Sequence, residues 1–414
     1  MKAQTEAKFV KFIHVALVYF LFNNVASGAV RWLFSLLHLS QLIYLPILGL
    51  LICIGLKFFL NIKDNKLNRI EALTFALFAY GLVLGFCFVP LSQVLFGFYV
   101  LVPMLAGLSV SGYLLKNPED YVKWIFILWL LAVIGVLLNY FVTMPWEGFE
   151  YEIAGKSIEG SRDWVDIGGL KRLAGFSRSS FDVAIQIQLL ASLMLTIRKN
   201  WFSNLLIWLL SGLSIYLTTS KGILNVYMVL TPIVLLPKRA LIKLNVSHWP
   251  IFFGALGIIL PISTLFFKYE STFDNQAIAN LTFSIFDRLN NMWPEAFLLM
   301  KNHGNTFLGR GFGALGTAQT YYEPELFNAG DNIFLYWMVI FGWPILIVEM
   351  IFLWASTYLN IFTTKTDYVY YILSLSVVVY GLTTNVVENA FFAFSLGITL
   401  PYLCALCIKK INEL

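Results

Sequence analysis

The sequence has 414 residues and a net charge of +5; 59% of its residues are hydrophobic and only 12% are charged. Soluble domains carry about 25% charged residues, so this composition, with a mean hydropathy of +0.77, excludes a water-soluble fold. In a membrane protein the side on which basic residues lie matters more than their sum, so the net charge does not indicate nucleic-acid binding. The cysteines lie in or at the end of apolar runs without the spacing of a metal or haem site, and we expect packed or lipid-facing thiols.

Twelve apolar runs follow one another along the chain, bounded by charged residues, proline or glycine. Runs of roughly 17 to 25 residues are candidate transmembrane helices. They lie near residues 10–27, 40–61, 70–89, 93–114, 121–142, 181–197, 201–218, 222–236, 249–267, 332–356, 368–386 and 390–408. No small-residue cleavage site follows the first run cleanly, so we interpret it as an uncleaved span. The sequence therefore predicts an all-α polytopic membrane protein with about twelve transmembrane helices in a single transmembrane domain, residues 1–414.

The distribution of lysine and arginine predicts the orientation in the membrane. If the N-terminus is cytoplasmic, 17 of the 28 lysines and arginines fall on the cytoplasmic side, and every short cytoplasmic connection carries at least one. Ten of the other 11 lie in two long outer loops and one tight outer turn, and the eleventh is Arg31. We therefore expect both termini to be cytoplasmic.

The two long outer loops are residues 143–180 and 268–331. Loops of this length are uncommon and often functional. In the second loop, the spacing of Ile285, Leu289 and Phe297 is that of one helix face. We expect these outer loops to contain short amphipathic helices that lie at the membrane interface.

A polar, glycine-rich segment, residues 288–343, leads out of the second loop into the next span. Ionisable groups between two spans are candidates for chemistry. The cations of this segment are Arg288, Lys301 and Arg310, and its sequence LGRGFGALG supplies a flexible backbone that can approach a ligand closely.

Asp331, in the same segment, has two interpretations that do not exclude each other. It is the N-cap of a helix that begins at Asn332, a position where Asp is favoured, or it is a catalytic carboxylate. Tyr321 and Tyr322 are aromatic platforms on which sugars stack, or they belong to the interfacial aromatic belt. Trp293 is assigned to the belt.

A second polar stretch, residues 171–188, leads from the first outer loop into a span. Arg172 and Arg178 lie near the membrane surface, and Asp182 and Gln186 follow on one helix face. Snorkelling of the arginines to the headgroups explains them without a function. Because arginines on the outer face oppose the positive-inside bias, we favour anion binding.

Three further ionisable residues lie at outer turns or inside a span. Lys221, in the outer turn TTSKG, either reaches headgroup phosphate or forms an anion site. Glu388, in the last outer turn, can pair with an arginine or bind a sugar hydroxyl. Glu349 lies inside an apolar run, as a functional or ion-pairing candidate or as a group solvated near the cytoplasmic edge.

These residues together indicate an outer pocket rich in arginine and lysine, without a metal-binding cluster. Arginine binds phosphate oxygens through two parallel hydrogen bonds, which predicts a lipid-linked pyrophosphate as the ligand. Fixed cations can stabilise a departing diphosphate without a metal or other cofactor. Asp331, Glu388 or His303 is available to take the proton of an attacking sugar hydroxyl.

Three stretches of the chain resemble the O-antigen polymerase and O-antigen ligase superfamily of polytopic membrane glycosyltransferases. They are RLAG at residues 172–175, TSKG at residues 219–222, and a long pattern in which Arg288-x4-Trp293 precedes His303, LGRGFG and Asp331-Asn332. The layout of spans and outer loops is similar over nearly the whole chain. The ligases typically have a histidine where Asp331 stands, whereas Wzy-type polymerases are more variable there, so the polymerase is the better match.

The resemblance implies a GT-C-like fold in the bacterial inner membrane and a polymerase reaction. In that reaction the growing glycan moves from undecaprenyl pyrophosphate to the non-reducing sugar hydroxyl of a carrier-linked repeat unit, with inversion at the anomeric carbon. The expected partners are undecaprenyl-pyrophosphate-linked oligosaccharides, membrane lipids and a chain-length regulator. We assign the catalytic group to Asp331, Arg288 and Arg172, with Arg172 and Arg288 holding pyrophosphate. The predicted substrate-binding residues are Arg178, Lys221, Arg310, His303, Tyr321, Tyr322, Asn332 and Glu388.

Two alternatives stay open at this point. One is an O-antigen ligase, which transfers glycan to the lipid A core. The other is a flippase or transporter for the same lipid-linked sugars. A flippase would carry charges well inside its spans, and this sequence has almost none there.

Overall fold

The computed structural model describes residues 2–63, 69–114, 121–153, 156–162, 165, 169–197, 200–269, 276–359, 362 and 364–413. The long helices of the first half are α1 (Lys2–Val25), α2 (Ser27–Leu36), α3 (Leu45–Lys63), α4 (Arg69–Phe88), α5 (Leu91–Leu114), α6 (Val122–Phe141), α7 (Ser180–Ile197), α8 (Trp201–Leu217) and α9 (Lys221–Leu235). The second half contains α10 (Lys238–Lys243), α11 (Trp249–Ser263), α12 (Gln276–Asp287), α13 (Trp293–His303), α14 (Thr317–Tyr322), α15 (Ile333–Phe341), α16 (Ile345–Ser356), α17 (Lys365–Gly381) and α18 (Ala390–Glu413). Short 3-10 turns are η1 (Ser40–Tyr44), η3 (Val246–His248), η5 (Pro324–Leu326) and η6 (Val386–Glu388), and η4 (Arg288–Met292) is a π-helical turn.

Six helical segments in the described part of the chain are long and apolar enough to cross a membrane. They are Ser40–Ile62, Glu71–Phe88, Leu91–Gly112, Val122–Phe141, Val246–Ser263 and Ala390–Lys410. The helices α1 and α2 pass the same test as a pair, but they are bent by 90° at the break between them. Shorter apolar helices are Ser180–Leu195, Trp201–Leu217, Lys221–Leu235 and Ile345–Ser356. These helices support an all-α polytopic membrane protein, whereas the number of twelve spans stays a prediction.

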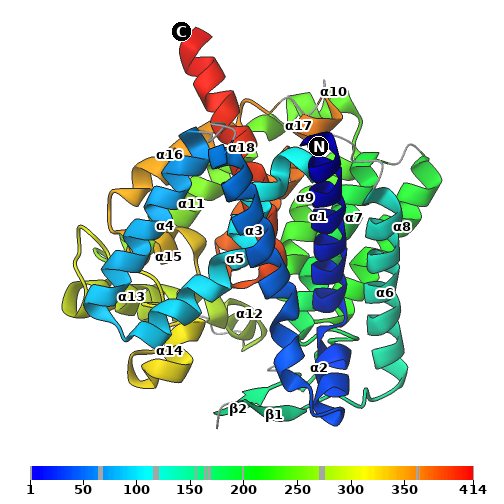
Figure 1. The fold of residues 1–414 in the computed structure, drawn as a ribbon, viewed down its shortest axis with the longest axis horizontal. Helices are drawn as coiled ribbons and strands as arrows, with labels where there is room; N and C mark the ends of the chain where they lie inside the picture. Colours follow the sequence, from blue (N-terminus) through cyan, green and yellow to red (C-terminus); the bar gives the residue numbers. More distant parts are fainter. Residues whose placement is uncertain are drawn as a thin grey trace.

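The two ends of the helical bundle differ in what they carry. Figure 1 shows both marked chain ends at the end of the bundle near α10, whereas α2, β1 and β2 lie at the opposite end, with α14 also in that direction. We call this opposite end the loop end. It corresponds to the outer face in the topology that the lysine and arginine distribution predicts.

The first outer loop contains a β-hairpin where we expected amphipathic helices. Strands β1 (Glu150–Ile153) and β2 (Lys156–Glu159) are antiparallel, and Tyr151 lies opposite Ile158. Tyr151 is buried, so the hairpin covers part of the loop end. In the second outer loop, α12, the π-helical turn and α13 make residues 276–303 helical. That such helices lie at the membrane interface stays a prediction.

The run predicted as one span over residues 332–356 is divided into α15 and α16. The break falls at Gly342, whose φ of +76° is in the left-handed region, and Pro344 follows two residues later. Neither residue continues a regular helix, because the first leaves the helical conformation and the second lacks a backbone N–H. Hydropathy does not report such a break, since the residues on both sides of it are apolar.

The most extensive pairing of described helices is between α5 and α18. Two glycines lie where these helices cross. A Cβ on Gly107 would lie 2.2 Å from the carbonyl oxygen of Phe394, and a Cβ on Gly397 would lie 2.0 Å from that of Met104. Small residues allow helix backbones to approach closely inside a membrane. This crossing fixes α18 against α5, and both helices line a cavity at the loop end.

We expect Gly397→Ala to destabilise the protein by about 1–3 kcal/mol, because the added methyl group overlaps a backbone oxygen that cannot move alone. Thermal unfolding in detergent measures the effect. Gly112→Ala is the matched control. Gly112 lies in α5, outside the crossing, and a Cβ at this position has no neighbour within 4 Å. Equal unfolding midpoints for the two variants would contradict the close crossing.

Candidate functional site

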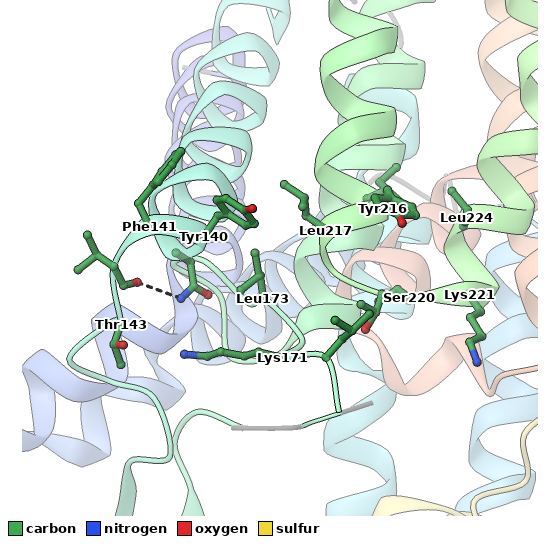
Figure 2. A pocket seen from close by; sticks show the side chains of 15 residues that line it. Tyr140, Phe141, Thr143, Lys171, Leu173, Tyr216, Leu217, Ser220, Lys221 and Leu224 are labelled. Atoms are coloured by element: carbon green, nitrogen blue, oxygen red, sulfur yellow. Dashed lines mark hydrogen bonds between the residues drawn. The ribbon is translucent and has the colours of Figure 1, made fainter. Parts of the chain in front are cut away.

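A cavity of about 770 Å³ lies between the end of α6, residues 170–173 and the turn that joins α8 to α9. We call it the lysine cavity, after Lys171 and Lys221 in its lining. Figure 2 shows these two lysines along one edge and Leu217 and Leu224 on the apolar side. Lys221 is the first residue of α9, and its side chain is exposed. Apolar walls beside ammonium groups suit an amphipathic molecule with an anionic headgroup.

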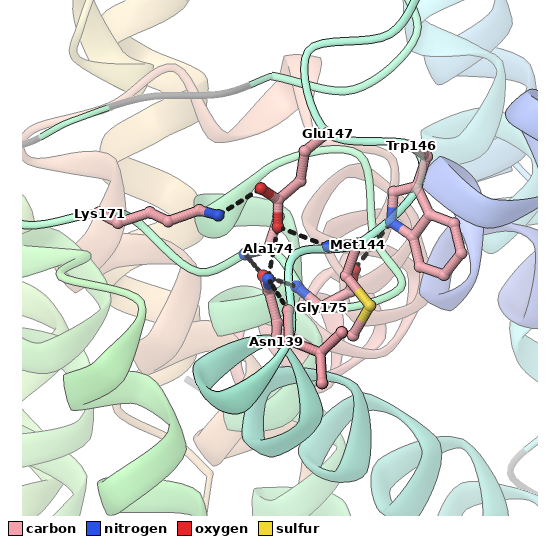
Figure 3. Close-up of polar contacts among 8 residues, drawn as sticks. Asn139, Met144, Trp146, Glu147, Lys171, Ala174 and Gly175 are labelled. Atoms are coloured by element: carbon pink, nitrogen blue, oxygen red, sulfur yellow. Dashed lines mark hydrogen bonds and ion pairs between the residues drawn. The ribbon is translucent and has the colours of Figure 1, made fainter.

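The loop that borders the lysine cavity is hydrogen-bonded to α6 through Asn139. This residue is buried, and its Oδ1 accepts hydrogen bonds of 3.1 Å from the backbone N–H groups of both Ala174 and Gly175. Its Nδ2 donates to Glu147 at 2.5 Å, and Glu147 also accepts a hydrogen bond from Lys171 (Figure 3). The loop backbone at Ala174 and Gly175 is therefore bound to α6.

Glu147 stays ionised in this network at neutral pH. Burial opposes its ionisation, but hydrogen bonds from Lys171, the Met144 backbone N–H and Asn139 outweigh burial and lower the pKa of the carboxyl. The carboxylate can therefore accept these bonds together.

The far end of the same loop is bound to the break between α1 and α2. The backbone N–H of Gly28 donates to the carbonyl oxygen of Phe176 at 3.0 Å, and the backbone N–H of Arg178 donates to Ser27 Oγ at 2.9 Å. Because helix N-termini leave N–H groups without intrahelical partners, the first turn of α2 can bind this loop. The bend between α1 and α2 therefore determines where Arg178 lies.

A second cavity, of about 290 Å³, lies at the starts of α2, α3, α7 and α18 and along α5. We call it the arginine cavity, after Arg31 and Arg178 in its lining. The Nε atoms of both guanidinium groups are buried without a hydrogen-bond partner, and neither group forms an ion pair within the part of the chain that the structure describes. A third arginine, Arg162, pairs with Glu159 at 3.1 Å. Two positive charges in one cavity without such partners favour an anionic ligand.

Two acidic residues line the arginine cavity, and both are held by neutral groups. Asp182 accepts hydrogen bonds of 2.7 Å from both Ser179 Oγ and Asn389 Nδ2. Glu388 accepts hydrogen bonds from the Thr317 backbone N–H at 2.9 Å and from its hydroxyl at 2.5 Å. Neither carboxyl is therefore bonded to Arg31 or Arg178.

Burial raises the pKa of Glu388 to about 7, although the hydrogen bonds from Thr317 favour the ionised form. The negative charge of Asp331 raises this pKa further. Gly316 leaves the space that the carboxyl occupies: a Cβ there would lie 2.1 Å from Glu388 Oε1, and the φ of +83° at this position also favours glycine. A carboxyl with a pKa near neutrality exchanges a proton readily at neutral pH, which is what a general base requires.

Arg288 and Asp331 form an ion pair of 2.8 Å. Arg288 also donates to the carbonyl oxygen and hydroxyl of Ser284, one turn earlier. Burial raises the pKa of Asp331, Arg288 opposes the increase, and Asp287 adds to it. Two of the three predicted catalytic residues are thus brought together, but as partners of each other.

The cap of α15 is Asn332 and not Asp331. The Oδ1 of Asn332 accepts hydrogen bonds of 2.9 Å from the backbone N–H groups of both Phe334 and Leu335. Its Nδ2 donates to the carbonyl oxygen of Gly257, and the residue is fully buried. The predicted substrate-binding Asn332 therefore joins α11 to α15, and the prediction that Asp331 caps this helix is wrong.

Arg310 is fully buried, and its guanidinium group is occupied by the interior of the second loop. It donates to the carbonyl oxygens of His303 and Ala314 at 2.9 Å each and pairs with Glu323 at 2.8 Å. The His303 side chain is exposed at the end of α13. Arg310 therefore connects parts of the second outer loop by hydrogen bonds, and it does not line the arginine cavity.

The glycines of LGRGFGALG contact helices, although we expected them to approach a ligand. A Cβ on Gly311 would lie 2.0 Å from the backbone nitrogen of Gly85 in α4, and a Cβ on Gly313 would lie 2.3 Å from the carbonyl oxygen of Gln93 in α5. Gln93 also donates to the Gly313 carbonyl oxygen at 2.8 Å. These glycines let the loop backbone lie directly on α4 and α5.

The remaining predicted residues lie around these features. The guanidinium carbon of Arg172 lies 4.6 Å from the ring centre of Phe181, which lines the arginine cavity. Tyr321 and Tyr322 contact the ring of Phe96, with centroid distances of 5.5 and 6.4 Å. Trp293 is fully buried, so its assignment to the interfacial belt is wrong. Its size and apolar surface place it equally well in a packed core.

Of the predicted site residues, the arginine cavity brings together Arg178 and Glu388. It adds Arg31, which lies in none of the polar motifs of the sequence. The sequence did contain one indication of Arg31. Of the 11 basic residues on the predicted outer side, it is the one that lies outside the two long loops and the tight turn. Within the described part of the chain, no group of three or more His, Cys, Asp or Glu residues could hold a metal ion.

Comparison with protein-family models, with curated proteins and with solved structures found no match.

We expect Asn139→Leu to loosen the loop between β2 and α7, because the N–H groups of Ala174 and Gly175 lose their acceptor. Such a loss is on the order of 1–3 kcal/mol, so trypsin should cleave after Lys171 about tenfold faster or more. Limited proteolysis followed by mass spectrometry measures the rate. Leu138→Ala, at the neighbouring lipid-exposed position of α6, is the control, and equal cleavage rates in both variants would show that Asn139 does not hold the loop.

Proposed function

We propose that this protein is a membrane glycosyltransferase of the O-antigen polymerase type. It transfers a growing glycan from undecaprenyl pyrophosphate to the non-reducing sugar hydroxyl of a carrier-linked repeat unit at the outer face of the bacterial inner membrane. The arginine cavity is the observation that carries this proposal. It combines two guanidinium groups that have no ion-pair partner among the described residues with a carboxyl whose pKa is about 7.

The arginines of the cavity match the diphosphate of the donor. A guanidinium group offers parallel N–H donors to two phosphate oxygens and keeps its charge at any physiological pH. Asp182 is occupied by Ser179 and Asn389, so it does not compete for Arg31 and Arg178. The cavity lies at the ends of helices, where a diphosphate can stay at the surface while its isoprenoid chain extends into the bilayer.

Glu388 is the base in the transfer step. The acceptor hydroxyl oxygen attacks the anomeric carbon from the face opposite the diphosphate, and the bond from that carbon to the diphosphate oxygen breaks. The diphosphate leaves with the bonding electrons, the hydroxyl proton passes to Glu388, and the configuration inverts. Arg31 and Arg178 stabilise the negative charge that develops on the leaving group.

The other predicted residues support this centre. Asp331 is paired with Arg288, so we assign the base to Glu388 and give the pair an electrostatic role, since the charge of Asp331 acts on the Glu388 pKa. Arg172 lies on Phe181 at the cavity wall. The lysine cavity, with Lys221 beside apolar walls, accommodates part of a lipid carrier.

We expect Arg31→Ala and Arg178→Ala each to reduce polymer by about a hundredfold or more, because each removes a fixed donor to the leaving group. Silver-stained polysaccharide from a deletion strain, complemented with each variant, measures the effect. A ladder that collapses to one capped repeat unit indicates a polymerase, whereas loss of all capped core indicates a ligase.

The matched control for the arginine variants is Lys301→Ala, which removes an exposed outer cation that does not line the arginine cavity. Arg178→Lys keeps the charge but removes the two-pronged donor, so it should restore little activity. Full-length ladders in both arginine-to-alanine variants would refute the diphosphate role of the cavity.

The activity of the purified protein should depend on pH through Glu388. A base with a pKa of about 7 is protonated at low pH, so the rate should rise about tenfold per pH unit below 7 and level off above it. Glu388→Gln should lower the rate by about 10²–10⁴ and remove this rise. An unchanged pH profile in the variant would exclude Glu388 as the base. The control is Glu325→Gln, which changes an exposed carboxyl group outside the cavity.

A further inference from the structure

A third cavity, of about 370 Å³, lies within the membrane-spanning part of the bundle between α4, α15, α16, α17 and α18. Its lining is apolar apart from Thr74, two cysteines and Glu349, and it includes no Lys, Arg or His. Along the single helix α18 the lining runs from Leu396 to Ile408, which is about 18 Å at the helical rise of about 1.5 Å per residue. The cavity is therefore elongated along this helix, a shape that suits a hydrocarbon chain.

The rim of this cavity is open to the hydrocarbon of the bilayer. Leu73 and Ile408 line it, and they are 73% and 48% exposed although both lie in segments apolar enough to cross a membrane. In a membrane such side chains contact lipid, so a lipid chain reaches the cavity from the side without passing through the aqueous phase.

Glu349 is the feature that distinguishes this cavity from an ordinary lipid-facing groove. Its side chain is 6% exposed and lines the cavity, and neither of its carboxyl oxygens has a hydrogen-bond partner among the described residues. Buried polar groups in proteins are almost always hydrogen-bonded, because losing contact with water without a new partner costs free energy. A ligand in the cavity can therefore supply the hydrogen-bond partner that the Glu349 carboxyl group lacks.

The chemistry of the cavity restricts this partner. A phosphate or zwitterionic headgroup would need cations, and none lines the cavity. A long-chain ammonium would bring a second charge out of water, whereas a hydroxyl group is much less costly to bury and can form hydrogen bonds with a carboxyl group. An uncharged head on a long hydrocarbon chain fits both the shape and the polarity.

We propose that this intramembrane cavity binds an uncharged long-chain lipid alcohol, with its hydroxyl group hydrogen-bonded to Glu349. The site is separate from the arginine cavity, because the two share no lining residue. The proposal does not depend on the glycosyltransferase function.

Photo-crosslinking of the full-length protein in lipid nanodiscs tests this site. The probe is a sixteen-carbon alcohol with a diazirine in its chain, and the comparison probes are the matched alkane and the matched primary amine. Mass spectrometry identifies labelled peptides from α4 and α18, which both contribute to the lining of the cavity. We expect saturable labelling by the alcohol at concentrations roughly five- to tenfold lower than by the alkane, the gain from one buried hydrogen bond.

The variants locate this preference at the carboxyl group. Glu349→Leu should remove the advantage of the alcohol over the alkane, whereas Glu349→Gln, which still donates and accepts hydrogen bonds, should keep most of it. Met350→Leu is the control, since this neighbour in α16 is 63% exposed and does not line the cavity.

Three results would overturn the proposal: equal labelling of the wild-type protein by alcohol and alkane, an unchanged preference in Glu349→Leu, or stronger labelling by the amine. The first and third comparisons use the wild-type chain, so they decide the matter even if Glu349→Leu does not fold.

Discussion

The loop end depends on hydrogen bonds that fix an irregular segment, residues 171–179, between helices. Asn139 binds the backbone at its middle, and Ser27 binds the backbone near its end. Ala174 and Gly175 are buried, and buried backbone N–H groups need partners of this kind because they have lost their contacts with water. As a result, Arg178 is held in the cavity that Arg31 also lines, although the two residues are far apart in the sequence.

Arginines near the loop end are in three different electrostatic situations. Arg310 is surrounded by two carbonyl oxygens and Glu323, so its charge is used to hold a loop together. Arg288 is paired with Asp331 and influences its surroundings as half of an ion pair. Arg31 and Arg178 have no ion-pair partner in the described part of the chain, and their charge is available to a ligand. Residue type alone does not separate these cases, since burial and partners decide what a guanidinium group can bind.

Two glutamates that line cavities give the molecule two different kinds of candidate site. Glu388 is hydrogen-bonded by Thr317 beside a polar cavity, and its pKa of about 7 suits proton transfer in the proposed glycosyl transfer. Glu349 lines an apolar cavity inside the membrane-spanning region without a partner among the described residues, which suits the hydroxyl group of a lipid. The same functional group thus acquires different chemistry from its surroundings, and the two cavities have no lining residue in common.

The sequence by itself determined the class of protein, because a chain that crosses hydrocarbon must satisfy its backbone within long apolar helices, and hydropathy reads such runs directly. It also indicated Arg178 and Glu388, since charged residues at the outer ends of spans are few. Only the tertiary structure added Arg31, assigned Arg310 to the loop interior and divided the span over residues 332–356 at Gly342. The reason is physical: hydropathy is a local property, whereas a binding site depends on which helix ends meet, and this is decided by close contacts such as the α5–α18 crossing and the hydrogen bonds of Asn139.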